Sequence, residues 1–305
     1  MAVTDRGDGV RKSIPHAKSF IMDLKDFLQK SGHDTDSVMV MRHRPGADTL
    51  WRVLPWLAAE HHELYNAYQQ VQNPDAEKAL GKASLLVSMI AHQDKALFVG
   101  LYRPAGWKVI TGAEFWAIPE MTALKKHGMT GMKHETAKFF ELERLDDMAT
   151  WKGRLVVKWP PGRLWWRWAA NNSFPLHAIH EDSLLDAEMP PWDRLSLSWN
   201  QLRVLPTKWQ TVLSQWRGIY LIFDRSDGKA YVGSAYGSEN ILGRWRDYAG
   251  SGHGNNMQLR LRSPENFLFS ILQRTSPDLD RDDVLSLEAN WKERLHSREY
   301  GLNEN

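Results

Sequence analysis

The 305-residue sequence predicts an α+β fold, and three observations support this class. The chain before residue 93 shows mainly helical spacing of its apolar residues, whereas the chain after it carries aromatic and β-branched runs between turn residues. The last ninety residues contain a strand–turn–strand pattern followed by two amphipathic helices. With 42% hydrophobic and 25% charged residues, the composition is that of a globular protein with room for two domains.

The first region, 1–93, is predicted to be largely helical. Its first helix carries apolar residues at helical spacing and should end at Gly32. A short strand is expected at 38–41, and two further helices at 50–70 and 76–91. The stripe of the first helix is Phe20, Leu24, Phe27 and Leu28.

The second region, 94–190, is predicted to be β-rich. Strands at 96–102 and 107–111 flank Pro104-Ala105-Gly106 as an expected hairpin, and Pro160-Pro161-Gly162 should reverse the chain between two later strands. Those later strands and one before them are expected at 139–142, 155–159 and 164–168. Residues 191–215 contain scattered prolines and are interpreted as a linker, ending in a short helix, before a last domain at 216–305.

Several classes of protein are excluded by composition. The chain has no cysteine, so disulfide frameworks, zinc–thiolate sites and thiol nucleophiles are excluded. The first dozen residues lack the apolar run of a secretory signal. The longest apolar stretch, 85–91, is much shorter than the roughly 20 residues of a membrane helix. We therefore expect a soluble, cytoplasmic protein without a membrane partner.

A basic, tryptophan-rich segment lies in the middle of the chain. Residues 151–170 hold five basic residues, five Trp and no acidic residue. Cations bind phosphates and aromatic faces stack on bases, so this segment is a candidate nucleic-acid surface. The alternative is that Trp159, Trp166 and Trp168 belong to an ordinary β core and that the cations form a solvated face. The candidate DNA-binding residues are Lys152, Arg154, Lys158, Arg163, Trp165 and Arg167.

The C-terminal region carries the most specific pattern. Strands at 217–223 and 229–233 surround Asp227-Gly228, and a turn near 225–226 would place Tyr220 roughly opposite Tyr231. A helix at 241–248 has Arg244 and Tyr248 on one face. A late helix is expected to bury Val284, Leu287, Trp291 and Leu295, with Glu288 and Lys292 on another line.

These residues resemble the motifs of the GIY-YIG nuclease superfamily over residues 217–305. The first motif is present as Gly218-Ile219-Tyr220, and the second as Tyr231-Val232-Gly233, with Val in place of Ile. The remaining landmarks follow in order: the family's helix arginine matches Arg244, its nearby Tyr or His matches Tyr248, a second His position matches His253, its metal-binding glutamate matches Glu288, and its terminal asparagine matches Asn303.

The resemblance implies a role for each matched side chain. Tyr220 would be the general base, which requires cations to lower its ordinary pKa near 10; Lys229 and the metal are the candidates. Glu288 would hold one Mg²⁺ or Mn²⁺ ion, and Arg244 would bind a phosphate oxygen. Tyr231 and Tyr248 would position the water and the phosphate. His253 would either assist the leaving group or bind backbone.

The resulting prediction is a Mg²⁺-dependent endonuclease of the restriction or phage-defence type, acting on double-stranded DNA. Residues 1–215 would select a sequence or a modified base, through a β-barrel that loosely resembles the PUA/SRA type. One active site per chain implies a homodimer or two successive nicks for double-strand cleavage. The alternatives are a repair or mobile-element nuclease, and a catalytically silent adaptor that binds DNA or RNA.

Overall fold

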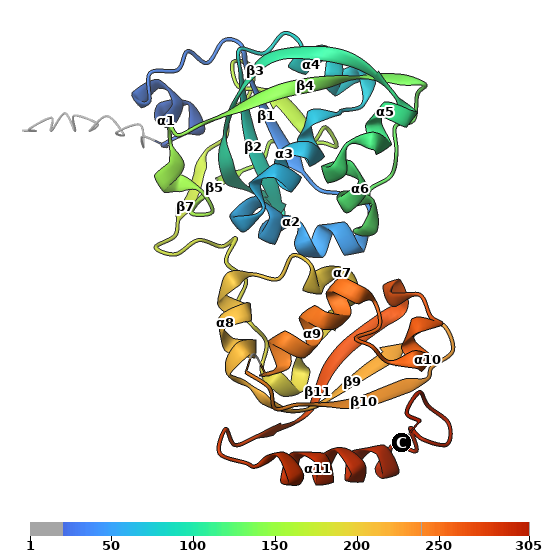
Figure 1. Cartoon of the computed structure of the whole chain (residues 1–305). Helices are drawn as coiled ribbons and strands as arrows, with labels where there is room; N and C mark the ends of the chain where they lie inside the picture. The colour runs from blue at the N-terminus through green and yellow to red at the C-terminus, as the bar shows by residue number, and fades with distance from the viewer. Residues whose placement is uncertain (1–20, 239, 305) are drawn as a thin grey trace, which may run out of the picture.

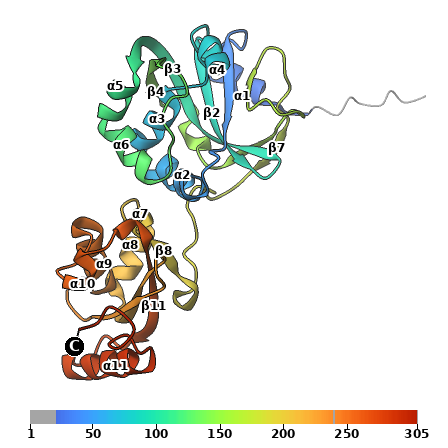
Figure 2. The same cartoon turned by 90° about the vertical axis from the view of Figure 1, so that its right-hand side faces the viewer.

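The computed structural model describes residues 21–238 and 240–304 and has the predicted α+β fold, in two units that pack on one another (Figures 1 and 2). The first residues of the first expected helix, including Phe20, lie outside the described residues. In the described chain, no helix combines the length and the apolar character needed to cross a membrane.

The N-terminal unit is built on a seven-stranded sheet in the order β6-β1-β2-β3-β5-β7, with β4 paired to β3. Strands β1 and β2 are parallel, and the other neighbours are antiparallel. The strands are β1 (Val38–His43), β2 (Leu85–His92), β3 (Lys95–Thr111), β4 (Thr136–Leu145), β5 (Leu155–Lys158), β6 (Trp166–Trp168) and β7 (Leu176–Ile179).

Apolar clusters cover both faces of this sheet. Val38 and Val40 of β1 belong to one cluster, and Met39 and Met41 to another, because successive side chains alternate between the faces. The surrounding helices are α1 (Leu24–Lys30), α2 (Asp48–Glu60), α3 (His62–Gln70), α4 (Pro74–Leu80), α5 (Gly112–Ala117) and α6 (Pro119–Lys126), with a 3₁₀ turn at Ala149–Trp151.

The helix expected at 76–91 is wrong in its second half. Helix α4 ends at Leu80, and 85–92 forms strand β2, which is almost entirely buried. A strand buried on both faces is a continuous apolar run and has no alternation to distinguish it from a buried helix. The helix expected at 50–70 is divided at His61 into α2 and α3.

Two expected chain reversals also differ. Residues 95–111 form one long strand, in which Pro104–Gly106 is a bulge against β4 rather than a hairpin turn. Pro160-Pro161-Gly162 does not join neighbouring strands, since β5 pairs with β3 and β7 whereas β6 pairs with β1. In the described chain the sheet runs as an open path from β6 to β7, which differs from the expected closed barrel.

The expected boundaries within 1–215 are not those of the structure. The division at 93/94 falls in the turn between β2 and β3, so 21–190 forms one unit. The expected linker contains β8 (Ser196–Ser198), which pairs with β11, and helices α7 (Trp199–Leu202) and α8 (Thr207–Gln215), which contact α9. A three-residue strand between prolines is too short to show a period, so its pattern resembled a linker.

The C-terminal unit has a four-stranded sheet in the order β10-β9-β11-β8. Helices α8 and α9 cover the face toward the N-terminal unit, and α11 covers the other (Figures 1 and 2). Its other elements are β9 (Arg217–Asp224), β10 (Ala230–Ala235), β11 (Phe267–Thr275), α9 (Asn240–Ser251), α10 (Met257–Arg260), α11 (Arg281–Arg294) and 3₁₀ turns at Trp192–Arg194 and Pro264–Asn266.

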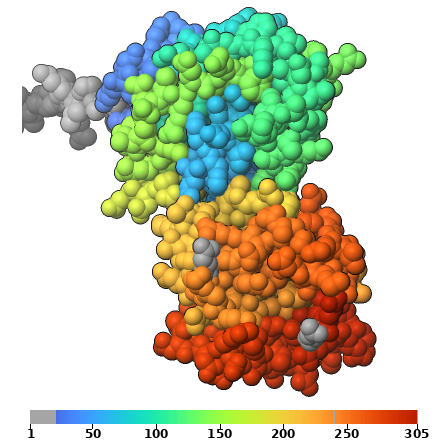
Figure 3. All heavy atoms as spheres, in the orientation of Figure 1, coloured from blue at the N-terminus to red at the C-terminus, as the bar shows by residue number. Residues whose placement is uncertain are grey.

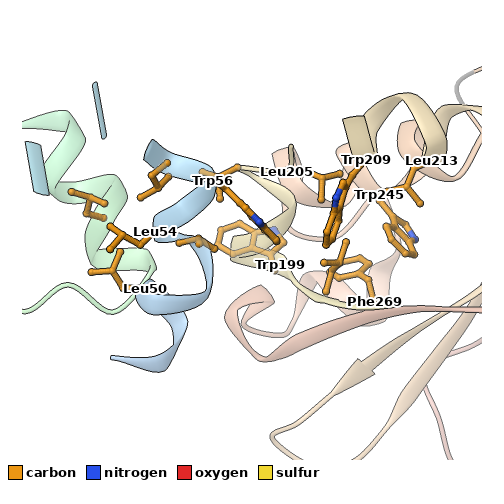
Figure 4. Packing of buried hydrophobic residues seen from close by; sticks show 14 of the residues in the cluster. Leu50, Leu54, Trp56, Trp199, Leu205, Trp209, Leu213, Trp245 and Phe269 are labelled. Atoms are coloured by element: carbon orange, nitrogen blue, oxygen red, sulfur yellow. The ribbon is translucent and has the colours of Figure 1, made fainter. Parts of the chain in front are cut away.

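The two units are in contact (Figure 3), and one continuous apolar cluster joins them (Figure 4). Trp56 of α2 contacts Trp209 of α8 edge to face, with ring centroids 5.1 Å apart. The Glu60 carboxylate accepts hydrogen bonds from Thr207 N (2.9 Å) and Oγ1 (2.6 Å) at the start of α8. The N-terminal unit is therefore seated directly on the helices that cover the C-terminal sheet.

Candidate active site

The β9–β10 hairpin brings the two expected tyrosine motifs together, two residues away from the expected register. Tyr220 pairs with Gly233, and Tyr231 pairs with Ile222. The loop is longer than expected because the Asp224 carboxylate accepts hydrogen bonds from Ser226 N and Oγ, which fixes a wider turn. A shift of two residues keeps every side chain on its original face, so both tyrosines still lie on one face of the sheet.

Gly233 is required by the position of the Tyr220 ring. A Cβ at residue 233 would lie 2.5 Å from Cζ and 2.9 Å from Cε2 of Tyr220, well inside van der Waals contact. The phenol of the first motif therefore lies directly across the backbone of the second. This packing is the physical reason for a glycine at the end of Tyr231-Val232-Gly233.

Helix α9 adds a third tyrosine to this cluster. The hydroxyls of Tyr220 and Tyr248 are 3.1 Å apart, and the rings of Tyr231 and Tyr248 have centroids 6.4 Å apart. Tyr220 and Tyr248 are buried on Trp245 and Phe269, whereas Tyr231 is partly exposed. The cluster is therefore buried at Tyr220 and Tyr248 and accessible to solvent at Tyr231.

Arg244 is the cation of this cluster. Its guanidinium carbon lies 5.8 Å from the centroid of the Tyr248 ring, and its side chain is 39% exposed. Burial, followed by Tyr231, raises the pKa of Tyr220, and the Arg244 charge lowers it by less. Burial likewise raises the pKa of Tyr248. Both buried phenols are therefore neutral at pH 7, contrary to the expected depression of the Tyr220 pKa.

Lys229 is not brought to Tyr220. It is exposed at the hairpin loop, where its backbone N–H donates to Asp227, and it precedes Ala230, which pairs with Phe223. The expected electrostatic role at Tyr220 is therefore taken by Arg244 rather than Lys229. His253 lies in the loop after α9, where its Nδ1 accepts a hydrogen bond from Asn255 N (3.0 Å).

Glu288 approaches the hairpin from the opposite face. Its Oε1 forms an ion pair with Lys292 Nζ at 2.7 Å, and its Oε2 accepts a short hydrogen bond from Ser234 Oγ. Ser234 directly follows Gly233, so its side chain points away from the tyrosines and toward α11. The edge strand β10 consequently has the tyrosines and Arg244 on one side and Glu288 on the other.

Glu288 is the carboxylate expected to hold a hydrated Mg²⁺ ion, and its two oxygens contact Ser234 and Lys292. Among the described residues, no three His, Asp or Glu side chains gather as a potential metal cage. Mg²⁺ commonly keeps several waters and binds through one or two carboxylates together with substrate phosphate. Glu288 supplies one such carboxylate, 13% exposed beside the edge strand.

Asn303 anchors the end of the chain to the second motif. Its Oδ1 accepts from Val232 N and its Nδ2 donates to Val232 O, both at 2.8 Å. The side chain is buried, and it pairs with the free backbone edge of β10. Asn303 therefore holds the strand that carries Tyr231 and Gly233.

Two features of the site were not predicted from the sequence: the participation of Ser234, and the ion pair of Lys292 with Glu288. The position of Lys292 four residues after Glu288 on a helix was the available signal for an ion pair. Ser234 gave a weaker signal, namely that a polar side chain next to Gly233 must face the opposite side of the strand from Tyr231.

The six candidate DNA-binding residues have different environments. Lys152 Nζ donates to Ala59 O and Arg154 Nε to His180 O, so both hold the fold together. Arg167 donates to Pro161 O at 2.9 Å. Lys158 and Arg163 are exposed, and Trp165 lines a cavity. Of the tryptophans expected in the core, Trp159 is buried, whereas Trp166 and Trp168 are partly buried.

Comparison with known proteins gives two similar solved structures. The first is a variant of the catalytic domain of intron endonuclease I-TevI, 27% identical, with a TM-score of 0.25, covering 30% of this chain and 94% of that one. The second is the catalytic domain of homing endonuclease I-TevI, 28% identical, with a TM-score of 0.24, covering 28% of this chain and 96% of that one. No family model and no curated protein matches the chain.

Proposed function

We propose that the C-terminal unit hydrolyses phosphodiester bonds in double-stranded DNA as a Mg²⁺- or Mn²⁺-dependent endonuclease. The observation that supports this most strongly is the convergence of Tyr220, Arg244 and Tyr248 on one side of β10 with Glu288 on the other. Phosphodiester hydrolysis requires a charge clamp, a positioned water and a carboxylate for a divalent ion. These four side chains come from three separate elements and have those chemical types.

Arg244 would bind a non-bridging oxygen of the scissile phosphate, because its guanidinium is partly exposed and held over the Tyr248 ring. The partly exposed Tyr231, with Tyr248 behind it, would position the water and the phosphate. Glu288 would hold the divalent ion, which supplies Lewis-acid polarisation when bound. Ser234 and Lys292 fix the carboxylate of Glu288 in its present orientation.

Tyr220 would act as general base only after more positive charge enters the site. Burial raises its pKa, and Arg244 offsets this only in part. The Tyr248 hydroxyl at 3.1 Å can donate to a Tyr220 phenolate. Tyr220→Phe removes the proton acceptor and keeps the ring over Gly233, so it tests the base role without changing the packing.

The N-terminal unit would select the DNA, as in a cytoplasmic restriction or phage-defence enzyme. It is too large for a tether and is seated firmly on α7 and α8, which would hold a selecting surface at a fixed distance from the nuclease. Cutting both strands then requires a second copy of the chain or two successive nicks.

The test is cleavage of matched phage-length DNA in Mg²⁺, one preparation plain and one carrying modified cytosines. Cleavage that is lost in Tyr220→Phe and restricted to the modified DNA supports a modification-dependent enzyme, whereas discrete cleavage of plain DNA supports a sequence-specific one. If wild-type protein cuts neither DNA, the endonuclease proposal is wrong for these substrates.

A second candidate is a catalytically silent DNA-binding adaptor. The Glu288–Lys292 ion pair favours it, since an ammonium already neutralises the carboxylate that would hold the metal. Under this alternative, wild-type protein and Lys292→Ala would both bind DNA without cutting it. Cleavage by wild-type protein that depends on Glu288 would eliminate the adaptor.

A further inference from the structure

The N-terminal unit contains a cavity of about 440 Å³ at the carboxyl end of β1. Its wall is formed by the loop from β1 into α2, the end of α3, the turn at 128–130 and Trp165. Small-molecule sites commonly occupy ~300–1,000 Å³ and lie at the carboxyl ends of parallel strands, so size and place both suit a ligand. A smaller neighbouring cavity of about 190 Å³ shares Val71, Asn73 and Met129 with it.

Three aromatic rings lie in the wall of this cavity. The His43 ring has its centroid 5.3 Å from that of Tyr68 and 6.0 Å from that of Trp165. Tyr68 and Trp165 come from α3 and from the residue preceding β6, so the fold rather than local sequence brings them together. Flat aromatic faces of this kind bind planar heterocycles by stacking.

A buried polar side chain, His43, lies beside these rings and lines the cavity. It is 2% exposed, and burial lowers its pKa to about 4, which the Gln69 side chain offsets only in part. Its imidazole is thus neutral at pH 7, with one donor and one acceptor nitrogen. Within the described chain, His43 Nε2 has no hydrogen-bond partner. A ligand edge that forms a hydrogen bond matches this nitrogen, which a purely apolar ligand would leave unpaired.

An arginine lies at the rim of the cavity. Arg44 lines it and is exposed, and no carboxylate side chain is among the lining residues. The exposed Arg163 stands two residues before Trp165 in the loop that leads to the wall. A neutral aromatic interior with cations outside matches a base attached to a phosphodiester backbone.

We propose that this cavity binds a nucleobase that has rotated out of the target DNA, stacked against Trp165 and Tyr68. The proposal deepens and rests on the proposed function, because it states what the N-terminal unit reads: a single extruded base.

The test compares two duplexes of one sequence, one fully paired and one with a single base opposite an abasic site, which is easier to extrude. Binding is measured by fluorescence anisotropy without divalent ions, so no cleavage intervenes. Wild-type protein should bind the second duplex about five-fold or more tightly, and Trp165→Ala should lose this gain. Trp165→Phe should keep most of it, and the matched control Trp107→Ala, an exposed tryptophan on β3, should keep all of it.

Equal affinity of wild-type protein for the two duplexes would overturn the proposal. So would Trp165-dependent binding of free dCMP or 5-methyl-dCMP, measured by calorimetry, without any gain for the unpaired base; the cavity would then serve a free nucleotide. Cleavage in Mg²⁺ is scored separately. Loss of the binding gain with cleavage intact rejects only the base site, and a retained gain without cleavage rejects only the nuclease.

Discussion

The two units place their polar and charged residues in contrasting ways. In the C-terminal unit, Tyr220, Arg244 and Glu288 converge around one edge strand. In the N-terminal unit, the cations of the basic segment are dispersed, and Lys152 and Arg154 bind backbone carbonyls. The order of residues in a motif therefore predicted which side chains come together. A basic composition did not, because basic side chains bind carbonyl groups of the protein as readily as they bind a ligand.

The largest expected effect compares two cations of the C-terminal hairpin and helix. Arg244→Ala should lower the cleavage rate about 10²–10³-fold, because it removes the charge beside the phenols and the expected phosphate clamp. Lys229→Ala should stay within about two-fold of wild type, because it is exposed at the loop. Single-turnover rates measure both. A decrease for Lys229→Ala as large as that for Arg244→Ala would contradict the placement of the site.

Acidification should destabilise the N-terminal unit through its buried histidines. Burial lowers the pKa of His43 and of His127 to about 4, so an unfolded chain gains protons below pH 6.5 that the folded chain refuses. The free energy of unfolding is therefore unaffected by the titration of these histidines above pH 6.5. It decreases as the pH falls to about 4, by up to ~3 kcal/mol for each histidine.

Urea unfolding at pH 7 and pH 4.5 measures this loss. His127→Asn should show a smaller decrease in unfolding free energy between the two pH values than wild type. His134→Asn, which changes an exposed histidine, should show the wild-type decrease. Equal decreases in all three proteins would mean that His127 titrates freely in the folded state.

Gly233→Ala should disturb the C-terminal unit by an amount typical of overpacking. The added Cβ overlaps the Tyr220 ring, so we expect a loss of about 1–3 kcal/mol in unfolding free energy together with lower cleavage. Gly237→Ala is the matched control, since no atom lies within 4 Å of its Cβ position. If both variants behave alike in urea, the ring does not lie across β10.

The smallest expected effect concerns the cations of the N-terminal unit. Lys158→Ala with Arg163→Ala should weaken DNA binding and reduce the slope of log affinity against log salt by about one for each phosphate that is no longer neutralised. The pair Lys152→Ala with Arg154→Ala should leave that slope unchanged, because both side chains bind carbonyls. A larger change in slope for the second pair of substitutions would mean that DNA contacts Lys152 and Arg154 instead.

The sequence predicted the β9–β10 hairpin and the helices α9 and α11, but it missed β11 and β8, the other two strands of the C-terminal sheet. It could not give the hairpin register, since that depends on how the Asp224 carboxylate folds the loop. Nor could it give the position of Glu288 on the opposite face from Tyr220, which depends on the packing of α11.

The N-terminal unit was predicted less well. The strand at 85–92 and the bulge at Pro104–Gly106 are determined by tertiary pairing and have no distinctive local pattern. Trp165 was expected at a nucleic-acid surface, but its neighbours Tyr68 and His43 come from distant segments that only the fold brings near.

The most direct test of the central claim, that Glu288 and the tyrosine cluster form one nuclease site, is cleavage of supercoiled plasmid in Mg²⁺. Wild-type protein is compared with Glu288→Ala and with Glu293→Ala, which changes another glutamate of the same helix. We expect Glu288→Ala to cut at least about 10²-fold more slowly with unchanged DNA affinity, and Glu293→Ala to match wild type. Equal cleavage by all three proteins would contradict the claim.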